Sequence, residues 1–209
     1  YGYRVSGVHT FGDKAYLMML DAFAEANQET SILGKRFALD HGQMITPEVI
    51  ERSAELGVIW SLQPPQYYRS AAIVNRIFGE EYAHRWTMPV RSLLDAGVKV
   101  TYGADTHDDP HRHPMHNLEV LVTRVTQDGR IFGSRERIER AEALLMMTRW
   151  GSEYVLREEE LGSIEAGKLA DLVVLDNSPL DPDVSDEDLS EITVVATLIG
   201  GEVVHGALN

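Results

Sequence analysis

Residues 99–110 read KVTYGADTHDDP, and this stretch points to the fold class of the chain. Its β-branched and aromatic residues at 100–102 predict a short strand that ends at Gly103. Asp105 then enters a polar loop. A carboxylate just after a strand is common at active sites, although aspartate also favours turns. The role of Asp105 therefore depends on what the other strands place beside it.

The chain repeats a strand followed by a helical pattern four times. The expected strands are residues 4–9 (RVSGVH), 36–41 (RFALDH), 58–63 (VIWSLQ) and 99–105 (KVTYGAD). In the first unit, apolar residues at 15, 18, 19, 22, 23 and 26 predict the buried face of a helix. In the second, Pro47 and Gly57 predict where the helix begins and ends. Such units predict an α/β fold with parallel strands, either a small open sheet or half of an eight-stranded barrel.

Three of these four strands end in a possible metal ligand, namely His9, His41 and Asp105. Because the carboxyl ends of parallel strands share one rim, we expect the three side chains to converge. Each alone is also typical of a polar strand end, so the hypothesis rests on their coincidence. Two imidazoles and a carboxylate suit a divalent ion such as zinc, with a position left for water. The ion would lower the pKa of that water toward about 7 and Asp105 could take up its proton, which predicts hydrolysis.

The composition favours a soluble protein with a small-molecule partner. The 209 residues are 44% hydrophobic, which is enough to bury a core. There are 33 acidic and 19 basic residues, and the net charge of -14 disfavours nucleic acids and anionic membranes as partners. The chain has no cysteine, which excludes disulfides and thiolate metal sites. No apolar run approaches the roughly 18 residues of a membrane helix, and we expect a cytoplasmic protein.

The pattern changes after Gly151. Residues 169–176 (LADLVVLD) predict a further strand, and residues 193–199 and 202–205 predict a tight hairpin around a Gly-Gly pair. The connection at 177–190 is rich in proline and aspartate. The tail is therefore expected to form β-structure of its own.

Five motifs resemble one known family. They are HTFGDKA at 9–15, DHGQ at 40–43, SLQP at 61–64, GAD at 103–105 and LGSIEAGKLADLVVLD at 161–176. Together they are similar to the C-terminal half of an amidohydrolase of the family 3 branch, and the last motif is the most specific. The resemblance implies that residues 1–160 form about four βα units of a distorted (β/α)8 barrel. It further implies that residues 161–209 form C-terminal strands and a hairpin of a small β-sandwich.

The resemblance also implies a chemistry. The family holds one or two divalent ions, here expected to be zinc, and hydrolyses amide or other non-peptide C–N bonds. By position, His9 and Asp105 would bind metal, Asp105 would activate the water, and His41 would bind a second metal or contact the substrate carbonyl. The family's His-x-His pair and its bridging residue have no counterpart in this chain. We therefore expect a partial site, completed by the N-terminal half of the same enzyme, and no activity from this chain alone.

Further residues near the strand ends are weaker candidates. Gln63, Tyr67 and Arg69 could line a substrate pocket, with Arg69 binding a substrate carboxylate. The histidine-rich segment 107–116 contains an HRH motif at 111–113, which is more typical of a solvated loop than of a metal site here. Two other readings stay open: a non-catalytic half-barrel that binds partners, and a small hydrolase completed by homodimerisation.

Overall fold

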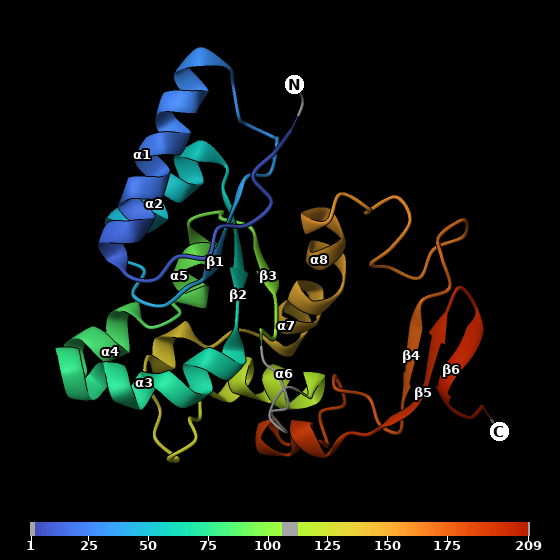
Figure 1. Cartoon of the computed structure of the whole chain (residues 1–209). Helices are drawn as coiled ribbons and strands as arrows, with labels where there is room; N and C mark the ends of the chain where they lie inside the picture. The colour runs from blue at the N-terminus through green and yellow to red at the C-terminus, as the bar shows by residue number, and fades with distance from the viewer. Residues whose placement is uncertain (1–2, 106–112, 209) are drawn as a thin grey trace.

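The computed structural model describes residues 3–105 and 113–208 and shows an α/β protein with two small sheets (Figure 1). The helices are α1 (Asp13–Glu29), α2 (Pro47–Leu56), α3 (Pro64–Phe78), α4 (Glu80–Trp86), α5 (Val90–Asp95), α6 (Pro114–Thr123), α7 (Arg140–Met147) and α8 (Arg149–Tyr154), with 3-10 turns η2 (Ser134–Glu136) and η3 (Asp186–Glu191). The strands are β1 (Ala38–His41), β2 (Ile59–Leu62), β3 (Val100–Tyr102), β4 (Leu172–Leu175), β5 (Val194–Ile199) and β6 (Glu202–Gly206).

Strands β1, β2 and β3 form a parallel sheet in that order. Leu39 lies opposite Trp60, and Trp60 lies opposite Val100. All three side chains are fully buried, as is usual for a parallel sheet covered by helices. Helices α5, α7 and α8 pack against β3. The parallel order confirms the prediction from the strand and helix units.

The first expected strand, residues 4–9, runs beside β1 but is not a regular strand. Two backbone bonds join it to β1, from Ala38 N–H to the carbonyl oxygen of Val5 (3.0 Å) and from Asp40 N–H to that of Val8 (3.1 Å). Donors two residues apart thus meet acceptors three residues apart, and the extra residue interrupts the pairing. Gly7, with φ of 156°, takes up this irregularity. The prediction of a regular strand at residues 4–9 is therefore wrong.

The helices follow the sequence pattern at their ends more closely than on their faces. Helix α2 begins at Pro47 and ends before Gly57, which has the left-handed φ of 62°, as predicted. Helix α1 buries Tyr16, Leu20 and Phe23, whereas Met18 of the predicted face is 63% exposed. The predicted face is thus partly confirmed, since Phe23 is buried and Met19 and Ala26 pack on the core. The buried stripe is rotated toward the bulkier Tyr16 and Leu20, which the pattern of small residues did not include.

The tail forms the antiparallel sheet β4-β5-β6, and β5 and β6 make the predicted hairpin. The connection before β5 packs on the helical layer. In η3, Leu189 is fully buried, and the backbone N–H of Ser190 donates to Glu119 of α6 over 2.9 Å. Arg140 of α7 binds Asp186 over 2.6 Å. Across the described ranges, no helix combines the length and apolarity of a membrane span.

Candidate metal and catalytic site

His41 and Asp105 lie at the carboxyl ends of β1 and β3 with unusual backbone conformations. Their φ angles are 86° and 45°, in the region that favours glycine. Such residues cost about 1–3 kcal/mol each and cluster at active sites. The next residue, Gly42, has φ of 83°, and a Cβ there would lie 2.3 Å from the side chain of Leu62. Packing around β2 thus fixes the backbone that presents His41.

The structure brings the side chains of His9, His41 and Asp105 together. Nε2 of His41 lies 2.5 Å from Nδ1 of His9. On the other side of the ring, Nδ1 of His41 lies 3.7 Å from Oδ2 of Asp105. That same oxygen accepts a hydrogen bond of 2.8 Å from the amide of Gln66. The three residues expected to converge are therefore neighbours, whereas their roles as ligands stay predictions.

The surroundings of His41 favour its neutral form. Its side chain is only 5% exposed, and the ring of Phe11 stacks on it at 4.4 Å between centroids. Burial lowers the pKa of His41 and the imidazole of His9 lowers it further, while Asp105 and Gln66 act in the opposite direction. A neutral imidazole has a lone pair for a metal or for a proton.

A second set of contacts holds the segment that carries His9. Asp40 directly precedes His41 on β1 and lies against the backbone of Gly7. A Cβ added at Gly7 would lie 2.7 Å from Oδ2 of Asp40. Burial raises the pKa of Asp40, and the neighbouring His41 partly opposes this shift. The Tyr154 hydroxyl donates to the backbone oxygen of Ser6 over 2.5 Å. Sequence reasoning missed this network, although Asp40 belongs to the DHGQ motif.

The donor types at this rim fit a zinc-type ion. Two imidazoles and a carboxylate are ordinary zinc ligands, and Nδ1 of His41 is buried without a hydrogen-bond partner among the described residues. The described residues nevertheless contain no group of three histidine or acidic side chains arranged to hold an ion. The 2.5 Å between the nitrogens of His9 and His41 is also shorter than the about 3.3 Å that separates two ligands of one tetrahedral zinc. One ion bound by both rings would therefore require them to separate and would need further donors.

The three residues predicted to line a substrate pocket have different environments. Gln63 follows β2 and is 4% exposed, and its amide donates to Ser61 over 3.3 Å. Tyr67 is fully buried, and its hydroxyl lies 2.8 Å from the carbonyl oxygens of Arg124 and Phe132. Tyr67 thus belongs to the core of the structure and does not face a pocket. Arg69 is exposed and donates to the carbonyl of Pro65 over 3.3 Å.

The histidine-rich segment is described only from residue 113 onward. Nδ1 of His113 accepts from the backbone N–H of Met115 over 3.3 Å, which caps the start of α6. The ring of His116 meets that of Tyr68 edge-on at 4.8 Å. His107 and His111 lie outside the described residues. For His113, capping is thus the contact observed.

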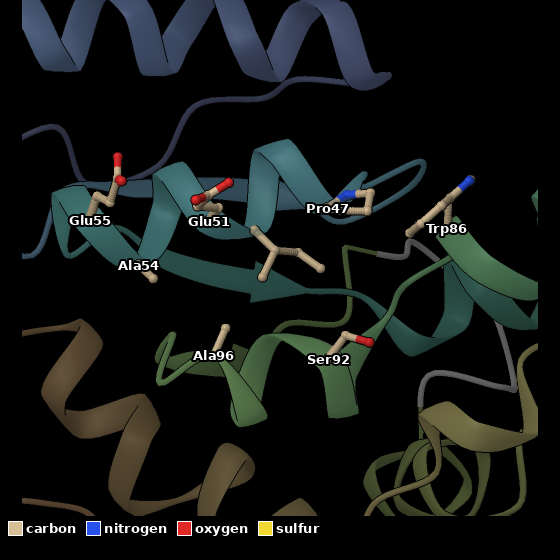
Figure 2. Close-up of a pocket in the computed structure, with 8 residues that line it drawn as sticks. Pro47, Glu51, Ala54, Glu55, Trp86, Ser92 and Ala96 are labelled. Atoms are coloured by element: carbon tan, nitrogen blue, oxygen red, sulfur yellow. The ribbon is translucent and has the colours of Figure 1, made fainter.

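A cavity of about 490 Å³ lies elsewhere, between α2 and α5 (Figure 2). Its lining residues are Pro47, Ile50, Glu51, Ala54, Glu55, Trp86, Ser92 and Ala96. None of the predicted site residues lines it. This cavity is therefore separate from the rim that carries His41 and Asp105.

The fold, with His41 and Asp105 at the carboxyl ends of its parallel strands, is that of the metal-dependent hydrolases. A solved structure described as an uncharacterized metal-dependent hydrolase from Pyrococcus furiosus matches with a TM-score of 0.68 and 31% identity. The match covers 84% of this chain and 34% of that one. The chain belongs to the amidohydrolase family, whose sequence profile matches residues 2–205. The resemblance seen in the motifs is thus confirmed.

Two curated relatives show how much of a family member the chain represents. The N-substituted formamide deformylase of Arthrobacter pascens is 33% identical over 194 residues, covering 93% of this chain and 35% of that protein. The protein LONG AFTER FAR-RED 3 of Arabidopsis thaliana is 28% identical over 199 residues, covering 95% of this chain and 33% of that protein. The chain therefore spans about a third of the length of these relatives.

Proposed function

We propose that this chain supplies part of the active site of a metal-dependent hydrolase that cleaves amide or other non-peptide C–N bonds in small molecules. The observation that carries the proposal is the meeting of His9, His41 and Asp105 at one rim of the parallel sheet. Strained backbone at His41 and Asp105 supports it, because strain of this kind concentrates at functional sites. The name of the deformylase relative makes N-substituted formamides the first substrates to test.

We assign Asp105 the role of proton acceptor. Its side chain is 53% exposed, so a water molecule can reach it, and Gln66 binds only one of its two oxygens. His41 would use its neutral ring to bind metal or to contact the substrate carbonyl, and His9 would be a metal ligand. A divalent ion, one or two and zinc first among the candidates, would supply Lewis acidity when bound, lowering the pKa of water and polarising the carbonyl.

We further propose that residues 1–160 are the C-terminal half of a distorted (β/α)8 barrel and that residues 161–209 are strands of a β-sandwich. Three parallel strands and the match to about a third of each relative support this division. A whole eight-unit barrel takes about 250 residues. The missing ligands would then come from the N-terminal half of the same enzyme. The 209-residue chain alone is accordingly expected to bind metal weakly and to show no turnover.

The test compares the 209-residue chain with a longer polypeptide that also carries the N-terminal half. Formate release from an N-substituted formamide reports turnover, and elemental analysis reports zinc content. We expect both only in the longer polypeptide. Asp105→Asn should lower its kcat by about 10²–10⁴, the usual contribution of a general base. Asp183→Asn, in an exposed part of the tail, is the matched control and should leave kcat unchanged.

Each alternative has its own result. Stoichiometric zinc and turnover in the 209-residue chain would disprove the partial site, and a dimer in that sample would favour completion by a second copy. No metal and no turnover in the longer polypeptide would favour a non-catalytic module. Full activity after Asp105→Asn would remove Asp105 as the proton acceptor.

A further inference from the structure

The ring of Phe11 contacts both histidines of the candidate site. It stacks on His41 with 4.4 Å between the ring centroids and 25° between the ring planes. It also meets the ring of His9 at 5.4 Å, tilted by 59°. The roles proposed above involve polar groups and leave this aromatic side chain without a function.

Contacts on both sides of Phe11 hold it in this position. On one side, the carbonyl oxygen of Val8 accepts a hydrogen bond from the backbone N–H of Asp40 in β1 over 3.1 Å. On the other side, Gly12 is the N-cap of α1, and its carbonyl oxygen accepts from the N–H of Tyr16 over 3.1 Å. Phe11 therefore lies in a short connection between the sheet and a helix, and both ends of this connection are anchored.

Much of the Phe11 side chain is in contact with solvent. The residue is 47% exposed although its ring stacks on His41, and His9 is exposed as well. A Cβ added to Gly12 would meet no atom of the described residues within 4 Å, so these residues leave room beside Phe11. Covering an exposed aromatic ring with an apolar group is favourable, because apolar surface is removed from water. The site thus offers an apolar surface next to its polar groups.

The short distance between Phe11 and His41 favours a substrate as the ligand that covers this surface. His41 is proposed above to bind metal or to contact the substrate carbonyl, and the ring of Phe11 is stacked directly on it. A substituent next to that carbonyl would therefore lie beside the Phe11 ring. Sites for small molecules commonly combine a few polar groups with apolar and aromatic walls.

We propose that Phe11 determines specificity at this site by stacking with an aromatic substituent on the amide nitrogen of the substrate. Aromatic rings pair in offset or edge-to-face arrangements with centroids about 4.5–7 Å apart, and the exposed part of the Phe11 ring is available for such a pair. In a formamide the substituent must be on the nitrogen, because the formyl group has no side chain. The proposal rests on the proposed function for the amide group and deepens it, whereas contact between Phe11 and an aromatic ligand requires no hydrolysis.

The test measures the dissociation constants of two probes, N-phenethylformamide and N-ethylformamide, which differ by one phenyl ring. The polypeptide that also carries the N-terminal half is kept free of metal with a chelator, so that neither probe is hydrolysed, and binding is followed by NMR titration. One aromatic pair changes affinity by a factor of about 2–12. Phe11→Ala should therefore weaken binding of the phenethyl probe by this factor and leave binding of the ethyl probe nearly unchanged.

Further variants separate stacking from other effects. Phe11→Tyr keeps the ring and should keep the ratio of the two dissociation constants. Phe11→Leu keeps apolar packing on His41 without an aromatic face and should reduce the preference for the phenethyl probe, so it decides the question if Phe11→Ala does not fold. Phe78→Ala removes a phenylalanine of similar exposure, 49%, at the end of α3 and should bind both probes as the parent does. The amide signals of residues 194–206 report whether each variant is folded.

Three results would overturn the proposal: an unchanged ratio in Phe11→Ala or Phe11→Leu, equal weakening of both probes, or the same loss in Phe78→Ala. Adding zinc back to the same samples tests the proposed function separately. Absence of formate release would then count against the proposed function and leave the binding result intact. Formate release with an unchanged ratio in the Phe11 variants would overturn the role of Phe11 alone.

Discussion

Gly7→Ala should loosen the segment that carries His9, and the structure gives the size of the effect. An added Cβ would lie 2.7 Å from Oδ2 of Asp40 and 2.9 Å from the Tyr154 hydroxyl, closer than real side chains approach. Overpacking of this kind costs about 1–3 kcal/mol, and the φ of 156° adds a backbone cost of about 1–2 kcal/mol. We expect a loss of about 3 kcal/mol in the free energy of unfolding.

The assay is urea denaturation, with Gly34→Ala as the matched control. Gly34 also has a positive φ, 75°, but nothing lies within 4 Å of its added Cβ, so only the backbone cost of about 1–2 kcal/mol applies. The difference between the variants isolates the close approach of Gly7 to Asp40 and Tyr154. Equal losses in the two variants would refute the reasoning. In Gly7→Ala, the nuclear Overhauser contact between the rings of His9 and His41 should also weaken.

Two other perturbations test the framework around the site. Arg124→Met should lower the free energy of unfolding in urea by about 3 kcal/mol or more. The fully buried guanidinium of Arg124 donates to the carbonyl oxygens of Met88 (2.9 Å) and Thr87 (2.8 Å), and each buried carbonyl left unpaired costs about 1–3 kcal/mol. A loss under 1 kcal/mol would contradict this expectation. The ion pair with Arg36 lowers the pKa of Glu158 to about 2 from 4.5. The stability that this ion pair contributes should therefore be complete above about pH 4.5 and vanish as the pH falls to about 2. In Glu158→Gln, the urea midpoint should change less with pH over that interval than in the parent chain. The difference should be small, because both side chains are partly exposed to solvent.

Local patterns predicted the elements that depend on near neighbours. Pro47 and Gly57 set the limits of α2, and the Gly-Gly pair at 200–201 marked the hairpin, because caps and turns are decided within a few residues. The convergence of His41 and Asp105 also followed from sequence, since parallel strands bring their carboxyl ends to one rim.

Contacts between distant residues account for what the sequence did not reveal. Asp40 leaves no room for a side chain at residue 7, and the amide of Gln66 meets Asp105 across 39 positions of sequence. Tyr67 looked like a pocket residue because it follows a strand end, whereas its hydroxyl is used by backbone oxygens 57 and 65 residues away. Periodicity carries no information on such pairs.

The attachment of the N-terminal segment has a consequence for the order of folding. Arg4 donates to the carbonyl oxygen of Tyr154 over 2.6 Å, and the two residues are 150 positions apart. Contacts of such sequence separation form late, since their loop-closure entropy is recovered only after the intervening chain is ordered. The strands that present His41 and Asp105 pair over much shorter separations. We therefore expect the bond between Arg4 and Tyr154 to close in the last phase of folding, after residues 5 and 8 have paired with β1 and β1 has paired with β2.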